Sequence, residues 1–380
     1  MKPSKLSQLS EQDSTIAARI LAEQRRRRLE QAKARLEKSG QSDEAETSAV
    51  DHQGVVCDFE QPLQPFQHRL YHGEDMAKAM RLASGQDTRT ALLDLRHMGG
   101  VRPLAPVPTD FVERCQLLAD EFPHFQSIIE EKILPELAIG NFAGTGLKLP
   151  TLCIQGDPGV GKTYFASRIS EVFGLPFTRI NLEGAQGNFS IVGLDKSYSS
   201  HNPGEIIRFL SRRTKNHYTN GIIAFEEIDK AGGDARYSVE NSLIQILEEN
   251  TARTFRDMSI PELQIDITPL NFVFTANNLT TISSPVLSRL QPVELPPLEQ
   301  HHATHIAVNQ FAKLVEQLKL SGAGLTLTDS SLEVLGRISP REQKAVLRRA
   351  IGTAILNCRS EVIVPSTMGN PIKRVQIGFI

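Results

Sequence analysis

Short apolar runs alternate with longer amphipathic segments from about residue 149 onward. The runs TLCIQ (151–155), IIAF (222–225) and NFVFTA (271–276) are each bounded by polar or turn residues. Continuous apolar runs of this length are typical of strands that are buried on both faces of a parallel sheet. The pattern therefore predicts an α/β fold in which helices flank a parallel sheet.

Helical periodicity dominates the chain on both sides of this region. Before it, apolar positions recur at helical spacing over residues 110–138. After the pair Pro296-Pro297, the pattern predicts helices at about 299–319, 329–337 and 340–357. The C-terminal group therefore predicts a small α-helical domain that follows the α/β domain.

The first hundred residues show further changes of composition. Residues 14–39 are rich in good helix formers and contain the basic run Arg25 to Arg28. Residues 40–54 have the acidic, polar composition of a mobile linker. Three prolines between 103 and 108 interrupt any helix and indicate a boundary. We therefore predict five parts: a helical and mobile N-terminal extension (1–55), a region of unknown fold (56–107), an α/β domain (108–297), a helical domain (298–360) and a C-terminal tail (361–380).

The composition narrows the classes of function. The 380 residues carry a formal net charge of −2, which argues against a protein that coats nucleic acid through general positive charge. The four cysteines lie far apart, so neither a zinc ribbon nor a disulfide framework is indicated. The N-terminus lacks the apolar core of a signal peptide, and no apolar run approaches the ~18 residues of a membrane span. We expect a soluble, cytoplasmic protein.

A phosphate-binding motif stands between the first predicted strand and a predicted helix. It fits GxxxxGK[ST] and consists of Gly156, Asp157, Pro158, Gly159, Val160, Gly161, Lys162 and Thr163. Its glycines allow backbone N–H groups to converge on phosphates at the N-terminus of a helix. The motif predicts that Lys162 supplies a positive charge to the β- and γ-phosphates and that Thr163 offers its hydroxyl to Mg²⁺.

Two carboxylates end the second predicted strand. In the run GIIAFEEIDK (221–230), Glu226 and Glu227 directly follow the apolar residues. This end of a strand in a parallel sheet faces the ligand crevice. One carboxylate there holds hydrated Mg²⁺, and the next orients and deprotonates the attacking water. We assign Glu226 to the metal, through water, and Glu227 to the attacking water.

These motifs resemble those of AAA+ ATPases. The acidic run looks like their Walker B segment, and FEEIDKA is similar to the LDEIDKM-type segment of Lon proteases. The resemblance covers residues 108–357, and it implies a P-loop NTPase domain with a helical lid, ATP and Mg²⁺ as cofactors, and ATP hydrolysis as the activity. Glu226 replaces the usual aspartate, and its extra methylene is expected to reduce Mg²⁺ affinity or turnover.

The resemblance also implies two catalytic residues beyond the carboxylates. Asn277, at the tip of the strand 271–276, matches the sensor that hydrogen-bonds the γ-phosphate or the attacking water. Arg289 lies in the segment 283–290, which is similar to PLLDRME of Lon, and it matches an arginine that reaches the γ-phosphate of a neighbouring subunit. Ser284 is expected to cap the short helix before it, with Pro285 at the first position. The alternative for Arg289 is an ion pair within its own subunit.

A second arginine is implied in the lid. The run SPRE (339–342) is a capping box with proline at the first helical position, which holds Arg341 in the first turn. Arg341 matches the sensor-2 arginine of the lid, and Arg348 and Arg349 are weaker candidates. The sequence HHATH (301–305) has no carboxylate or cysteine in a zinc spacing, so a solvated helix is the simpler interpretation.

The loop between the two nucleotide motifs is the candidate substrate contact. Residues 193–208 resemble the Lon segment RRTYIGSMPGKIIQ, in which a Tyr-Ile pair lines a central pore and grips an unfolded polypeptide. Tyr198 matches the aromatic residue, but Ser199 replaces the aliphatic one, which weakens apolar contact. An ordinary half-exposed loop tyrosine is the alternative. Tyr237 is a candidate for a second pore loop.

The predicted function is that of a Lon-like AAA+ ATPase that forms a ring, expected to be a hexamer, and remodels, unfolds or translocates protein substrates. Few residues follow the last predicted helix, so we expect no peptidase domain with the Ser–Lys pair of Lon. A separate protease is then a candidate partner, and no membrane partner is expected. Two alternatives stay open: a motor acting on nucleic acid, suggested by Arg25 to Arg28, and a non-catalytic nucleotide switch, suggested by Glu226.

Overall fold

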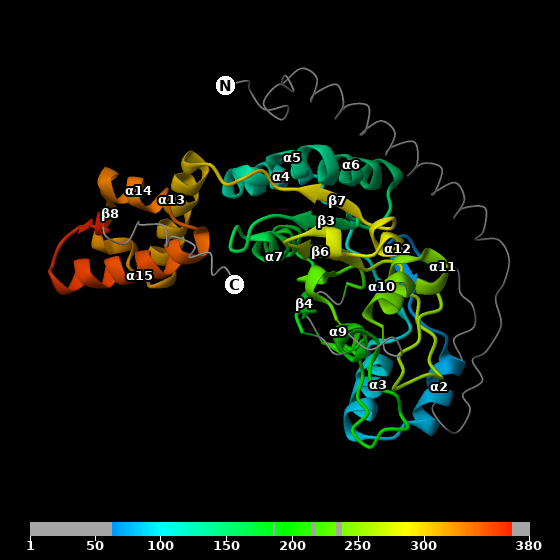
Figure 1. Cartoon of the computed structure of the whole chain (residues 1–380). Coiled ribbons are helices and arrows are strands. Elements are labelled where there is room, and N and C mark those ends of the chain that lie inside the picture. Colours follow the sequence, from blue (N-terminus) through cyan, green and yellow to red (C-terminus); the bar gives the residue numbers. More distant parts are fainter. Residues whose placement is uncertain (1–62, 185–186, 214–217, 233–237, 367–380) are drawn as a thin grey trace, which may run out of the picture.

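The computed structural model describes residues 63–184, 187–213, 218–232 and 238–366 (Figure 1). The predictions for residues 1–55, including Arg25 to Arg28, and for Tyr237 lie outside the described residues. Within those ranges, no helix combines the length and the apolar character that a membrane span requires.

A parallel sheet of five strands lies at the centre of the described part of the chain. The strand order is β4-β5-β6-β3-β7, and every neighbouring pair is parallel. The strands are β3 (Leu152–Gln155), β4 (Phe177–Asn181), β5 (Ile222–Glu226), β6 (Asn271–Ala276) and β7 (Gln291–Glu294). The parallel sheet predicted from the apolar runs is therefore confirmed. The residues that follow β3, β5 and β6 all emerge at the same edge of this sheet.

Alternate residues of each strand face two different hydrophobic cores. Leu152 and Ile154 of β3 face one core, and Cys153 between them faces the other. Helices cover the first face: α4 (Phe111–Glu121), α5 (Gln126–Ile128), α6 (Leu134–Ala143) and α7 (Lys162–Phe173). Other helices cover the second face: α2 (Gly73–Leu82), α3 (Gln86–Met98), α8 (Phe189–Val192), α9 (Glu205–Ser211) and α10 (Val239–Leu247). Burial on both sides explains why the strand sequences show no polar alternation.

The described residues before 104 belong to the second core. β1 (Gln67–Arg69) pairs antiparallel with β2 (Val101–Pro103), and α2 and α3 lie between them in the chain. Leu92 and Leu95 of α3 are fully buried in the same core as Phe225 of β5. Arg102 is buried and donates to the carbonyl oxygen of Leu210 at 2.6 Å, and its burial lowers its pKa to about 10. The part of the region 56–107 that the structure describes is thus packed into the α/β body.

A separate helical unit follows the sheet. It contains α13 (Gln300–Gln317), α14 (Asp329–Leu335) and α15 (Pro340–Leu356), close to the three predicted helices. β8 (Thr326–Leu327) pairs with β9 (Glu361–Val362). Val362 and Val364 are buried in the core of this unit, with Leu335 and Leu347. The lid therefore continues past the predicted boundary at 360, because the next residues supply a strand and two buried valines.

Candidate functional site

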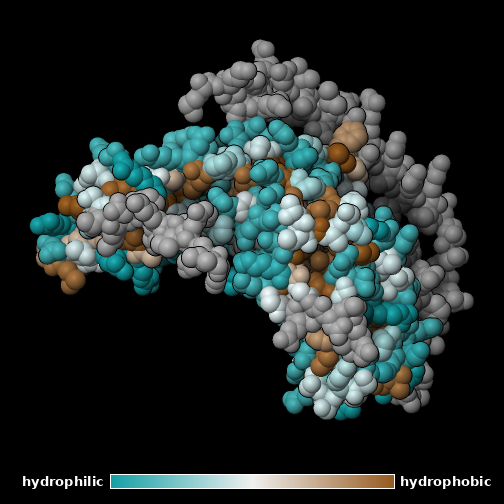
Figure 2. Space-filling model, in the orientation of Figure 1, coloured by the Kyte–Doolittle hydropathy of each residue, from teal (hydrophilic) through white to brown (hydrophobic). Residues whose placement is uncertain are grey.

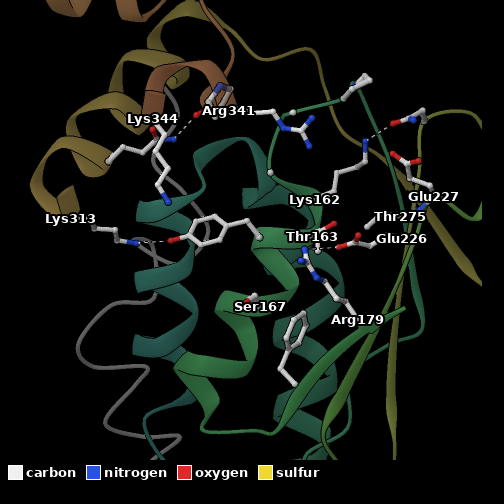
Figure 3. Close-up of a pocket in the computed structure, with 18 of the residues that line it drawn as sticks. Lys162, Thr163, Ser167, Arg179, Glu226, Glu227, Thr275, Lys313, Arg341 and Lys344 are labelled. Atoms are coloured by element: carbon white, nitrogen blue, oxygen red, sulfur yellow. Dashed lines mark hydrogen bonds and ion pairs between the residues drawn. The ribbon is translucent and has the colours of Figure 1, made fainter. Parts of the chain in front are cut away.

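A cavity of about 680 Å³ lies between the sheet edge and the lid (Figure 3). The space-filling view in Figure 2 shows the lid projecting from the α/β body, with a hollow beside it. Residues of the phosphate loop, α7, β4, the ends of β5 and β6, α13 and the start of α15 line the cavity. Its charged lining consists of Lys162, Arg179, Glu226, Glu227, Lys313, Arg341 and Lys344. The excess of cations over carboxylates suits a polyanionic ligand.

The phosphate loop has the backbone shape that its glycines permit. Gly159 and Gly161 have φ values of +86° and +95°, a region that other residues rarely adopt. Gly161 is the N-cap of α7, so the loop leads into the N-terminus of a helix of 12 residues. Free N–H groups and the helix dipole make such a terminus a site for anions. The helix runs from Lys162 to Phe173, and Gly174 in the left-handed conformation is its C-cap.

The motif residues divide into those that line the cavity and those that support it. The lining residues are Pro158, Gly159, Gly161, Lys162 and Thr163. Gly156 and Asp157 offer their carbonyl oxygens to Lys162 Nζ, at 2.5 and 3.1 Å. The carbonyl oxygen of Val160 lies 2.9 Å from Nε2 of His124. The first six of the eight predicted positions form the loop, the last two begin α7, and five of the eight line the cavity.

Glu226 and Glu227 stand at the end of β5, and both line the cavity. Oε1 of Glu226 lies 3.6 Å from the guanidinium of Arg179, a residue of the neighbouring strand β4. Glu227 has a φ of +57°, and its Oε2 accepts a hydrogen bond of 2.8 Å from Lys230 Nζ. Lys230 also donates to Glu183 at 2.8 Å, and the two carboxylates raise the pKa of Lys230. Each of the two predicted carboxylates is thus paired with a basic side chain, Arg179 for Glu226 and Lys230 for Glu227. Neither basic residue was predicted from the sequence.

Asp229 fixes the tip of β6, where Asn277 lies. Its Oδ2 accepts the backbone N–H groups of Asn277 and Asn278, each at 3.1 Å. Thr275 Oγ1 accepts the backbone N–H of Glu227 at 3.3 Å, which joins the ends of β5 and β6. Asn277 lines the cavity, and its side-chain oxygen lies 3.0 Å from Lys162 Nζ. The sequence does contain a signal for Asp229. It stands two residues after Glu227 in the EID segment, which places its carboxylate at the same edge of the sheet.

The lid contributes more cavity residues than the sequence predicts. Ser339 and Glu342 form the predicted capping box at the start of α15, and this turn carries Arg341 to the cavity. A Cβ on Gly159 would lie 3.7 Å from Cβ of Arg341, so the lid helix begins directly beside the phosphate loop. Lys344, one turn further along α15, and Lys313 of α13 also line the cavity. Helical spacing of i, i+3 from Arg341 could have found Lys344. Arg348 and Arg349 are not among the lining residues.

The segment of the chain that builds this edge of the sheet matches a known protein family. Residues 152–298 match the family described as "ATPase family associated with various cellular activities (AAA)". The matched range contains the phosphate loop, the carboxylate pair and Asn277, at the edge where the structure brings them together. Residues 152–298 form an AAA domain.

Relatives of this AAA domain occur among Lon proteases. Lon protease 2 of Herpetosiphon aurantiacus is 33% identical over 210 residues, which cover 55% of this chain and 25% of that protein. Lon protease 1 of Bacillus subtilis is 29% identical over 257 residues, which cover 65% of this chain and 33% of that protein. The chain therefore spans a quarter to a third of the length of these relatives. The resemblance to their ATPase module is confirmed.

A solved structure was also matched, the RuvB Holliday junction branch migration motor of Thermotoga maritima. It is 16% identical and has a TM-score of 0.43, with 64% of this chain and 67% of that chain covered.

Arg289 of the AAA domain lies outside the cavity lining. Its NH2 group is 2.6 Å from Oε2 of Glu248, so the ion pair within the subunit is formed in this structure. α12 (Ser284–Leu287) precedes it, with Ser283 rather than the predicted Ser284 at the N-cap. The Ser283 hydroxyl donates to Oε1 of Glu240 at 2.5 Å and makes no side-chain hydrogen bond to the helix. The side chain of Arg289 is 33% exposed and lies at the surface of the domain.

Tyr198 also lies away from the nucleotide cavity of the AAA domain. It belongs to the loop between α8 and α9, and its residue is 45% exposed. Exposure of this kind leaves the aromatic ring accessible to a partner. Its role in substrate contact stays a prediction.

A smaller cavity of about 50 Å³ adjoins the large one. Its walls include Phe122, His124 and Val160 of the α/β body and Ile306 of the lid. The ring of Phe122 packs edge-on against Phe125 and Phe165, at centroid distances of 5.7 and 5.3 Å. Burial lowers the pKa of His124 to about 4, so its imidazole is neutral at physiological pH. Glu121 and Lys313, which form an ion pair, also line this cavity, so it combines aromatic and aliphatic walls with one pair of charges.

Proposed function

We propose that this chain hydrolyses ATP and uses the energy to remodel, unfold or translocate a protein substrate within a ring of identical subunits. The observation that carries the proposal is the convergence of the phosphate loop, Glu226, Glu227, Asn277 and Arg341 on one cavity. These residues come from separate segments of the chain and together provide a phosphate cradle, a general base and a lid cation.

Each group has a role that follows from its position. The loop N–H groups and Lys162 neutralise the phosphates, and Arg341 adds a positive charge from the lid. Thr163 and Glu226 both line the cavity and offer the oxygen ligands that Mg²⁺ prefers. The ion, when bound, neutralises charge that develops on the transferred phosphoryl group. Glu227 accepts a proton from the attacking water, and Asn277 orients that water or the terminal phosphate.

The smaller cavity is the proposed site of the nucleotide base. It lies beside Gly161 and Tyr164, at the edge of the large cavity, and combines aromatic with aliphatic walls. A planar aromatic base packs favourably against aromatic and aliphatic walls of this kind. Because Ile306 and Pro340 of the lid form part of its wall, a bound base would join lid and α/β body.

The choice of a protein substrate rests on Tyr198 and on the Lon relatives. The nucleic-acid alternative depends on Arg25 to Arg28, which lie outside the described residues. We propose a hexameric ring because Arg289 is exposed away from its own cavity, where it can serve a neighbour. A separate protease as partner and a cytoplasmic location complete the proposal.

The substitution Glu227→Gln tests the proposal. It should leave ATP binding intact and slow hydrolysis at least ~10²-fold, as expected for loss of a general base. Glu183→Gln is a matched control, since Glu183 also binds Lys230 but does not line the cavity. Wild-type turnover in Glu227→Gln would contradict the assignment of the base. Wild-type protein that binds ATP without hydrolysing it would support the nucleotide switch instead.

The same variant tests the substrate. In the presence of ATP, Glu227→Gln should hold its client, so that proteins recovered with it by affinity purification exceed those recovered with Lys162→Ala. Enrichment of DNA or RNA in place of protein, sensitive to salt concentration, would favour the nucleic-acid alternative.

A further inference from the structure

We propose that the turn between α2 and α3 holds the candidate substrate loop in place, and that His201 is the positioning residue. The inference rests on the proposed role of Tyr198 as a substrate contact. The Tyr198 loop, residues 194–203, is closed at its neck by a hydrogen bond of 3.0 Å from Leu194 N to Asn202 O. Figure 1 shows the loop before α9, in green, extending down beside α2 and α3.

The imidazole of His201 bridges the Tyr198 loop to the α2–α3 turn. Its Nε2 lies 2.8 Å from the carbonyl oxygen of Ser84 and 3.1 Å from the Ser84 hydroxyl. Its Nδ1 lies 2.9 Å from the carbonyl oxygen of Tyr198 itself. One ring therefore lies between the backbone of the proposed substrate contact and a residue 117 positions earlier in the chain, and in its neutral form it donates to one of the two carbonyl oxygens.

The α2–α3 turn is shaped to receive this ring. Gly85 has a φ of +76°, and a Cβ at this position would lie 2.8 Å from Nε2 of His201. Any other residue would be strained and would push the ring away. The turn thus combines a hydroxyl, a carbonyl and a missing side chain at the point where His201 approaches.

Two other contacts hold the loop from a second side. Lys196 forms an ion pair with Glu262, whose side chain is only 12% exposed. Asp257 Oδ2 accepts the N–H of Gly204, just after the loop, at 2.8 Å. Lys196 holds the side of the loop, and Gly204 holds the residues just after it. Neither contact reaches the α2–α3 turn, so the attachment of the loop to that turn depends on His201. The placement of Tyr198 at the surface follows from both sides together.

The segment that carries the turn is itself fixed to the helix after the loop. Asp94 of α3 forms an ion pair of 2.8 Å with Arg213, just after α9. Leu92 and Leu95 of α3 share a core with Ile206 of α9. These contacts therefore join residues 63–103 to the Tyr198 loop and to α9. The segment before the AAA domain thereby has a role in positioning the proposed substrate contact.

A single-tryptophan reporter tests the positioning. The chain contains no tryptophan, so Tyr198→Trp in the full chain places the only indole in this loop. In that background His201→Ala should raise the acrylamide quenching constant about threefold and lower the anisotropy, because a released loop is more exposed and mobile. Ser84→Ala should have a smaller effect, since the carbonyl contact at 2.8 Å remains. Quenching that is unchanged in His201→Ala would overturn the inference.

A double-mutant cycle separates positioning from general damage. Gly85→Ala should raise quenching as His201→Ala does, and it should add little in the His201→Ala background because the ring is already gone. Gly99→Ala is the matched control: Gly99 also has a positive φ, +82°, but the nearest atom to its Cβ is 3.8 Å away. Equal effects of Gly85→Ala in both backgrounds would contradict a direct contact with His201.

Labelled casein, an unfolded polypeptide, links the loop to substrate. His201→Ala should raise the casein concentration needed for half-maximal ATPase stimulation about fivefold, while His201→Gln recovers part of the loss through its amide donor. Casein that stimulates no variant, wild type included, counts against the proposed function. The quenching comparison still decides the positioning in that case, so the two failures are distinguishable.

Discussion

Lys162 Nζ donates a hydrogen bond of 3.0 Å to Oδ1 of Asn277, across 115 residues of sequence. The contact joins the start of α7 to the tip of β6, since β3 and β6 are neighbours in the sheet. Desolvation lowers the pKa of Lys162, although the nearby carboxylates oppose it. The lysine is therefore held by oxygen acceptors at the place where phosphates would bind.

Removing the Asn277 amide should lower turnover more than ATP affinity. We expect Asn277→Ala to reduce kcat about tenfold or more, as one positioned hydrogen-bond donor to the reacting groups is lost, with little change in KM for ATP. Asn278→Ala is the control, because its side chain accepts from Thr280 N and does not line the cavity. Steady-state kinetics at saturating Mg²⁺ give both constants. Equal losses in the two variants would show that the strand tip, rather than the Asn277 amide, matters.

Glu226→Asp should strengthen the response to Mg²⁺. Oε1 of Glu226 lies 3.6 Å from Arg179, so the carboxylate that we propose for the metal site also pairs with that cation. The shorter aspartate withdraws from Arg179, and we expect the Mg²⁺ concentration for half-maximal ATPase activity to fall severalfold. An Mg²⁺ titration at fixed ATP measures this value. A rise would mean that the longer side chain is needed to reach the ion.

Arg289 should act between subunits. Arg289→Ala is expected to bind ATP nearly normally and to hydrolyse it poorly, because the arginine stabilises charge in a neighbour's transition state. Mixing it with Lys162→Ala should restore part of the activity, since some interfaces then pair an intact phosphate loop with an intact arginine. Size-exclusion chromatography of labelled subunits verifies exchange beforehand. If exchange occurs and the mixture stays inactive, Arg289 acts within its subunit, where it pairs with Glu248.

Burial of Asp257 should make stability depend on pH. Desolvation raises the pKa of this carboxyl from 3.8 to about 6, while hydrogen bonds from Ser259 and Gly204 oppose the shift. The folded state then holds a proton that the unfolded state releases, so this contribution is complete below about pH 4 and is lost as pH rises through 6. The loss amounts to about 3 kcal/mol.

Asp257→Asn removes that dependence and provides the measurement. Urea unfolding of wild type and variant between pH 4 and 7 gives the difference in their free energies of unfolding. That difference should shift in favour of the variant as pH rises to about 6 and then level off. A difference that is flat across the range would place the carboxyl in a more solvated setting than its 1% exposure indicates.

Short-range patterns were sufficient to predict the parallel sheet, the phosphate loop and the helical lid. Apolar runs, glycine spacing and the SPRE capping box act over a few residues, so β3, α7 and the start of α15 follow from the sequence alone. The position at a strand end supplied Glu227, and the family resemblance supplied Asn277 and Arg341; the structure brings all three to one cavity.

Only the tertiary structure decided the contacts between distant segments. Arg179 reaches Glu226 because β4 and β5 are neighbours, and Lys344 reaches the cavity because the lid folds over α7. Val362 and Val364 could not be assigned to the lid from the sequence, since a two-residue strand has no periodicity to detect. The contact of His201 with Ser84 depends in the same way on a glycine and a carbonyl far away in the chain. Such contacts depend on which surfaces the folded cores bring together, and no local propensity encodes them.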